Sequence, residues 1–153
     1  MLNPDFRDIL SALRAENVEF LIVGSYAVAA HGCARATEDL DVWVRPTEPN
    51  SQRVMRALLR FGAPTSRLSP SDFQSDDLVF QMGSPPWRID ILTSIDGVSF
   101  DEAWPERSEW TLEGLQLPVI GRRQLLINKR TMGRAKDLAD IERLEQEPPM
   151  EDP

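Results

Sequence analysis

The sequence predicts a small mixed α/β (α+β) domain, in which a mixed sheet is flanked by helices. Segments with strand patterns alternate along the chain with segments whose apolar residues recur at helical spacing. The chain has 153 residues, enough for one domain with a buried core. Hydrophobic residues make up 41% and charged residues 27%, as in ordinary globular proteins. We therefore expect a single domain over residues 1–146, followed by a flexible acidic tail over residues 147–153.

The first half of the chain is predicted to alternate helices and strands. Asn3 can cap a helix that has Pro4 at its first position, and apolar residues follow at helical spacing. Residues 19–23 are an apolar run typical of a buried strand, and residues 26–31 favour a short Ala-rich helix. Residues 39–44 alternate polar and apolar side chains, which is the period of a strand. This alternation assigns two faces: Leu40, Val42 and Val44 on one, and Asp39, Asp41 and Trp43 on the other.

The second half is predicted from turn residues and periodicity in the same way. Residues 46–50 can cap a helix that ends at Gly62, and residues 64–76 have the composition of a loop. The remaining predicted elements are strands over 78–82 and 87–92, a hairpin over 110–120, and helices over 122–131 and 134–146.

Charge and cysteine content exclude several classes of protein. The net charge of -8 argues against a broad basic surface for nucleic acid. Cys33 is the only cysteine, which excludes an internal disulfide and predicts a reducing, cytoplasmic setting. The longest apolar stretch, residues 20–23, is too short to span a bilayer, and the N-terminus shows no signal-peptide pattern.

The most informative pattern is the pair of carboxylates at Asp39 and Asp41. Residues two apart on a strand point to the same side, so the two charges repel unless water or a cation separates them. Asp90, in the middle of an otherwise apolar strand, is a third candidate. If the two strands are neighbours, the three carboxylates converge and could hold one or two Mg²⁺ ions. The alternative is that Asp39 and Asp41 form a solvated strand end.

Two further features could bind phosphate. Gly24 and Ser25 lie between a buried strand and a helix, where unpaired backbone N–H groups can hold an anion. The alternative is a tight turn capped by serine. Lys129, Arg130, Arg134 and Lys136 form a basic stretch in an acidic protein, and the alternative there is a solvated helix face.

In their order along the chain, these motifs resemble the nucleotidyltransferase superfamily with the DNA polymerase beta-like fold. The matching segments are residues 21–27, residues 35–42 with the Asp-x-Asp strand, Asp90, and residues 128–141. The spacing from Gly24 to Asp39 and the Arg-x-Thr lead-in look most like the abortive-infection AbiEii-type toxin branch. Ser25 stands where that branch often has a second glycine.

The resemblance implies an activity and a set of residue roles. The reaction would move a nucleoside monophosphate from an NTP, such as ATP, to an acceptor hydroxyl on RNA such as tRNA, on a protein or on a small molecule. Asp39 and Asp41 would bind the catalytic Mg²⁺ ions, and Asp90 would help to deprotonate the acceptor. Gly24, Ser25 and Lys129 would contact the phosphates, and Asp137 would orient Lys129 or the nucleotide. A neighbouring antitoxin protein would be a partner.

Two other functions fit the same residues. The chain could be a catalytically inactive binding or regulatory module that keeps the fold and binds nucleotide. It could also be a metal-dependent phosphoesterase, although the Gly24-Ser25 turn and Lys129 fit nucleotide binding better. Three converging carboxylates favour the enzyme, because a simple binding protein has no need of them.

Overall fold

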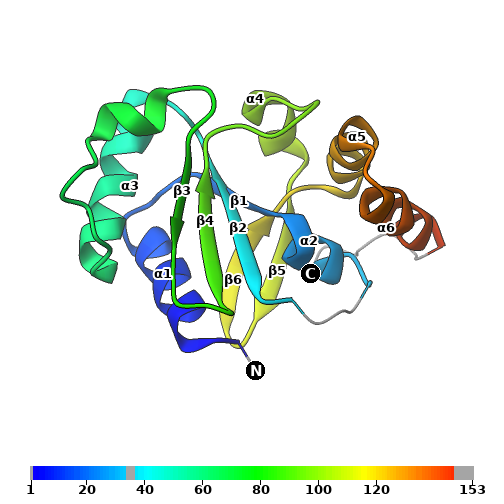
Figure 1. The fold of residues 1–153 in the computed structure, drawn as a ribbon, viewed down its shortest axis with the longest axis horizontal. Helices are drawn as coiled ribbons and strands as arrows, with labels where there is room; N and C mark the ends of the chain where they lie inside the picture. The colour runs from blue at the N-terminus through cyan, green and yellow to red at the C-terminus, as the bar shows by residue number, and fades with distance from the viewer. Residues whose placement is uncertain (1, 34–36, 147–153) are drawn as a thin grey trace.

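The computed structural model describes residues 2–33 and 37–146, which build a six-stranded mixed sheet with helices around it (Figure 1). The predicted tail, residues 147–153, and part of the Arg-x-Thr lead-in, Arg35 and Ala36, lie outside the described residues. The elements in chain order are α1 (Pro4–Ala15), β1 (Phe20–Val23), α2 (Gly24–Ala30), β2 (Asp39–Val44), α3 (Glu48–Phe61), η1 (Pro70–Gln74), β3 (Val79–Met82), β4 (Arg88–Leu92), α4 (Phe100–Ala103), η2 (Trp104–Glu106), β5 (Ser108–Leu112), β6 (Leu115–Val119), α5 (Arg122–Met132) and α6 (Ala135–Gln146).

The strands lie in the order β3-β4-β2-β1-β6-β5. Strand β2 pairs antiparallel with β1 and parallel with β4, and β1 pairs parallel with β6. The two outer pairs, β3–β4 and β5–β6, are antiparallel hairpins. The sheet is therefore mixed, as the sequence predicts, and β2 lies next to β4 as the carboxylate hypothesis requires.

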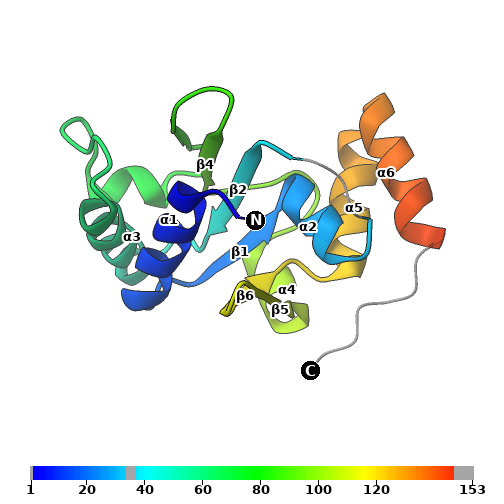
Figure 2. The same ribbon diagram turned by 90° about the horizontal axis from the view of Figure 1, so that it is seen from below.

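Helices cover different parts of this sheet. Figure 2 shows α1 and α3 together at one end of the molecule and α5 and α6 at the other, with the sheet between them. The predicted helix ends are confirmed at both α1 and α3. The side chain of Asn3 accepts a hydrogen bond from the backbone N–H of Asp5 at 2.8 Å, and Gly62 ends α3 in a left-handed conformation.

The core is built from the apolar faces that the periodicity predicts. Leu40, Val42 and Val44 are fully buried on β2, as are the inward residues of α1. Trp43, on the opposite face, is buried too, because Phe100 of α4 packs against its ring at 5.0 Å. Neither α4 nor η2 is predicted from the sequence.

One element boundary differs from the prediction: helix α2 begins at Gly24 itself and not after a Gly-Ser turn. The predicted separation of the last two helices is confirmed. Gly133 lies in a left-handed conformation between α5 and α6, so Lys129 and Lys136 do not share one continuous helix face. Within the described residues, none of the helices has the length and apolar character needed to cross a membrane.

Candidate active site

Asp41 and Asp90 lie directly opposite each other on the parallel strands β2 and β4. This register confirms that the two strands are neighbours and that both carboxylates point from the same face of the sheet. Asp90 is only 6% exposed. Its Oδ1 atom is buried and accepts no hydrogen bond from the described residues, although Arg88 Nε lies 3.4 Å away.

The environment of this pair favours the protonated form of a carboxyl. Burial, followed by the nearby charge of Asp90, raises the pKa of Asp41 from 3.8 to about 7. Burial also raises the pKa of Asp90, although the guanidinium of Arg88 opposes the effect. The two carboxyls are close enough to share a proton. A divalent cation would relieve the same repulsion in place of that proton.

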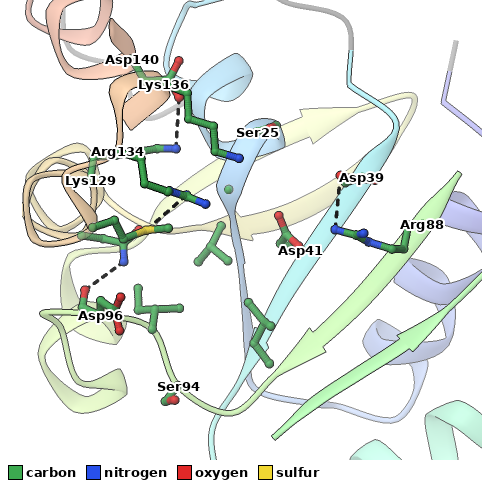
Figure 3. A pocket seen from close by; sticks show the side chains of 16 residues that line it. Ser25, Asp39, Asp41, Arg88, Ser94, Asp96, Lys129, Arg134, Lys136 and Asp140 are labelled. Carbon is green, nitrogen blue, oxygen red and sulfur yellow. Dashed lines mark hydrogen bonds and ion pairs between the residues drawn. The ribbon is translucent and has the colours of Figure 1, made fainter. Parts of the chain in front are cut away.

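Asp39 is turned toward Arg88 and not toward the Asp41–Asp90 pair. Arg88 Nη2 lies 3.6 Å from Asp39 Oδ2, and Figure 3 shows this contact to one side of Asp41. Arg88 thus bridges the outer and the inner carboxylate of the predicted triad. Consequently, the described residues contain no group of three His, Cys, Asp or Glu side chains that could hold a metal ion as they stand.

The donor set nevertheless fits Mg²⁺. Carboxylate oxygens are the ligands that this ion prefers, and it usually keeps several waters as well as one or two carboxylates. Asp41 and Asp90 supply two carboxylates, one of them with an unsatisfied buried oxygen. Asp39, half-exposed on the same strand face, would have to leave its ion pair with Arg88 to serve as a further ligand.

Gly24 allows α2 to begin directly against Asp41. Its φ angle is +68°, and a Cβ atom at this position would overlap Oδ2 of Asp41. Val23, the residue before it, pairs with Asp41 across the β1–β2 ladder. A glycine is therefore required here both by backbone conformation and by space. Ser25, the next residue, lines the cavity in front of the carboxylates.

Lys129 is buried between two carboxylates on the neighbouring helix. Its Nζ atom lies 3.3 Å from Asp137 Oδ1 and 3.1 Å from Asp140 Oδ2, and the residue is only 5% exposed. From the sequence, Lys129 is predicted to be a phosphate contact or part of a solvated helix face. The solvated face is wrong, because the ammonium group is enclosed and compensated by Asp137 and Asp140.

Asp137 fixes the turn between α5 and α6. Its carboxylate accepts hydrogen bonds from the backbone N–H of Arg134 at 3.2 Å and from Arg134 Nε at 2.6 Å. Burial acts to raise the pKa of Asp137, but the hydrogen bond from Arg134 and the charge of Lys129 outweigh it and leave the pKa below its usual value. Asp137 therefore holds Lys129 and Arg134, and it does not line the cavity itself.

A cavity of about 350 Å³ separates the carboxylates from this turn. Gly24, Ser25, Asp39 and Asp41 line one side, and Lys129, Arg134, Lys136 and Asp140 line the other. Figure 3 shows the side chains of Arg134 and Lys136 extending into the space in front of Ser25 and Asp41. Asp39 and Asp41 thus face a basic wall formed by the side chains of Arg134 and Lys136. This arrangement suits a phosphate chain bridged to the carboxylates by a cation.

Several lining residues are not among the site residues predicted from the sequence: Ser94, Asp96, Asn128 and Asp140. The last two nevertheless lie in the segment 128–141, which is part of the resemblance. Asn128 donates from Nδ2 to the carbonyl of Asp96 at 2.9 Å, which ties α5 to the loop after β4. Asp140 is three residues beyond Asp137 on the same helix, so helical spacing could have identified it as a second partner for Lys129. The loop residues carry no comparable signal.

No protein-family model matches the sequence, and no curated protein matches it. Solved structures do match the fold. The Thermotoga maritima protein TM1012, described as a candidate nucleotidyltransferase, superposes with a TM-score of 0.61 at 17% identity over 94% of both chains. The lincosamide adenylyltransferase LnuA, solved with lincomycin, superposes with a TM-score of 0.57 at 14% identity, over 95% of this chain and 98% of the LnuA chain. The antibiotic-resistance factor ANT(2'')-Ia superposes with a TM-score of 0.59 at 14% identity, over 92% of this chain and 80% of the ANT(2'')-Ia chain.

These matches cover 92% to 95% of this chain. The identities are low, so the similarity concerns the fold. The chain has the mixed α/β fold of the nucleotidyltransferases.

Proposed function

We propose that this protein is a Mg²⁺-dependent nucleotidyltransferase that moves a nucleoside monophosphate from an NTP to an acceptor hydroxyl. The observation that carries the proposal is the register of Asp41 and Asp90 on β2 and β4, with Asp41 lining a cavity whose other wall is basic. The fold neighbours support it, because one of them is an adenylyltransferase and another was solved with adenylyl-2''-tobramycin.

The chemistry follows from the placement of the charges. The acceptor oxygen attacks the α-phosphorus, a new P–O bond forms, and the bond to the β-phosphate breaks so that pyrophosphate leaves with the electron pair. Asp90, buried and with one unsatisfied oxygen, accepts the proton of the acceptor hydroxyl. Bound to Asp41, Asp90 and Asp39, Mg²⁺ would neutralise charge on the phosphates.

The basic wall would bind the phosphates of the NTP. Arg134 and Lys136 present charge to the cavity, and Gly24 and Ser25 approach from the opposite side. Lys129 and Asp137 have a different role in this proposal from the one implied by the resemblance. They stabilise the α5–α6 turn and keep Arg134 in place, since Asp137 contacts both basic side chains.

A small molecule is the acceptor class that we favour over tRNA or a protein. LnuA was solved with lincomycin, and ANT(2'')-Ia with an adenylylated tobramycin. The net charge of -8 also weighs against extended contacts with RNA. A toxin role in the cytoplasm, with an antitoxin partner, follows only from the resemblance to the AbiEii-type branch.

The second candidate is a nucleotide-binding regulatory module without catalysis. The specific observation that favours it is the pairing of Asp39 with Arg88, which leaves the three carboxylates short of a complete metal site.

Label transfer separates the two functions. The purified chain, Mg²⁺ and each of four α-labelled NTPs are incubated with total cell RNA, total protein and a small-molecule extract, beside an Asp41→Asn control. We expect label on a small molecule, resolved by thin-layer chromatography, only with the wild type. Label on RNA or protein would instead identify tRNA-like or protein acceptors. Binding of Mg²⁺–NTP by calorimetry without transfer to any fraction would favour the regulatory module.

A further inference from the structure

A second cavity, of about 270 Å³, lies beside the first. Its walls come from the end of β3, the β3–β4 turn and the start of β4, and Asp39 completes them. This volume is near the lower end of the ~300–1,000 Å³ found for small-molecule sites. The cavity can therefore hold a compact molecule.

The two cavities share two lining residues. Asp39 and Arg88 line both of them. Gln81, which lines the second cavity, is the cross-strand partner of Asp90. Asp90 itself lines neither cavity, so a molecule seated in the second cavity would approach this proposed proton acceptor past Gln81 and Arg88.

Trp87 gives this cavity an aromatic wall. Its side chain is among the few large hydrophobic ones that are exposed, with 41% of the residue accessible. Its indole meets the buried ring of Phe6 edge to face, with centroids 6.0 Å apart, so the ring is supported from behind. Met82, Pro85 and Pro86 add apolar surface around it.

We propose that this second cavity is the acceptor subsite, and that it takes a small cyclic alcohol whose ring lies on Trp87 and whose hydroxyl reaches Asp90. This inference rests on the proposed function, because it assigns the acceptor of that reaction. The supporting observation is that two cavities share Asp39 and Arg88 as lining residues, one with the basic wall on its far side and the other with apolar and aromatic side chains.

The charges near the second cavity indicate which small cyclic alcohols it can accept. Asp39, Asp41 and Asp90 on one face of the sheet outnumber Arg88, which is already paired with Asp39 and Asp90. An anionic acceptor would be repelled, whereas a neutral or cationic ring compound would not. The aromatic wall favours a ring over an open-chain polyol, because only the ring offers a flat face.

Binding without turnover tests the assignment. Wild type and variants are saturated with Mg²⁺ and an NTP analogue that has a methylene between the α- and β-phosphorus. The probes are tobramycin, lincomycin and uridine as cyclic alcohols, sorbitol as the open-chain control and glucose 6-phosphate as the anionic control. Calorimetry measures the affinity for each probe and, separately, for the NTP analogue.

We expect at least one uncharged or cationic cyclic probe to bind the wild type more tightly than sorbitol or glucose 6-phosphate. Trp87→Ala should weaken that binding about tenfold, and Trp87→Phe, which keeps a ring, by no more than about twofold. The matched control is Leu59→Ala, another exposed apolar side chain, on α3 and outside both cavities. It should change neither affinity.

The outcomes are distinguishable. The acceptor assignment is overturned if no cyclic probe binds, or if Trp87→Ala and Leu59→Ala have the same affinity for the probe. In that case the proposed function still stands as long as the NTP analogue binds. If the analogue itself fails to bind, the proposed function fails and the acceptor assignment fails with it. Loss of analogue affinity in Trp87→Ala would place Trp87 in the nucleotide site and would also overturn the assignment.

Discussion

Asp41 and Asp90 are cross-strand partners that can share one proton, and this couples the stability of the domain to pH. The unfolded chain releases the proton of Asp41 near its ordinary value of 3.8, whereas the folded chain holds it to about 7. Below both values the two states bind the proton equally. Between them only the folded state does, so stability falls as pH rises through this window and levels off above about 7.

Asp41→Asn should remove this loss, because an amide does not ionise. The quantity to compare is the free energy of unfolding of Asp41→Asn minus that of wild type, measured in EDTA. This difference should be about 2–3 kcal/mol larger at pH 8 than at pH 5. Urea unfolding at both pH values measures the difference, and it cancels the titration of groups common to both proteins. A difference that stays the same at pH 5 and pH 8 would contradict the shared proton. Asp39→Asn serves as the control for loss of one charge from the same strand.

Mg²⁺ should restore the stability that wild type loses at high pH when Asp41 ionises. At pH 8, millimolar Mg²⁺ should raise the melting temperature of wild type by several degrees, because an ion that binds only the folded state stabilises it by mass action. Asp41→Asn should show less than half of that rise. Equal rises in the two proteins would mean that Mg²⁺ binds elsewhere.

Gly24→Ala should disturb the site as well as the backbone. The positive φ angle strains any residue with a Cβ atom, and the added atom would overlap the Asp41 carboxylate. We expect a loss of about 2–4 kcal/mol of stability and no response to Mg²⁺. Gly62→Ala is the matched control, because φ there is +90° but no atom lies within 4 Å of the added Cβ. It should cost about 1 kcal/mol and keep the Mg²⁺ response. Similar losses in both variants would argue against a contact with Asp41.

Substitutions at Lys129 and Lys136 should distinguish a residue that stabilises the fold from one that binds the phosphates. Lys129→Met leaves Asp137 and Asp140 without their buried cation and should cost about 3–5 kcal/mol of stability, measured by urea unfolding. Lys136→Met, at an exposed position, should change stability by less than about 0.5 kcal/mol. Calorimetry should instead show that Lys136→Met weakens the affinity for an NTP and leaves the affinity for the corresponding nucleoside unchanged. Equal loss of both ligands in Lys136→Met would exclude a phosphate contact.

The periodic elements were predictable because burial imposes the period. The alternation of β2 follows from one face packing into the core, and the ends of α1 and α3 follow from Asn3 and Gly62. The pairing of Asp41 with Asp90 could be stated only as a condition, since a sequence does not specify which strands are neighbours. The structure meets that condition.

Other parts of the site depend on tertiary contacts that leave no local pattern. Trp43 shares the face of Asp41 but is buried because Phe100 arrives from a helix too short to be recognised. Lys129 is enclosed because the chain reverses at Gly133 and brings Asp137 and Asp140 back over it. The second cavity needs Asp39 and Trp87 from distant segments. The toxin branch, the metal and the domain boundary at residue 146 stay predictions.

The parallel pairing of β2 with β4 has a consequence for the order of folding. Two parallel strands cannot be joined by a tight turn, and here the connection runs through α3 and β3 before β4 is reached. Contacts between such distant segments close long loops and are intrinsically slow to form. The two carboxylates therefore meet only when this long-range pairing forms. Their repulsion is then absent from the early nucleus, and removing it with Asp41→Asn should slow unfolding while leaving the refolding rate nearly unchanged.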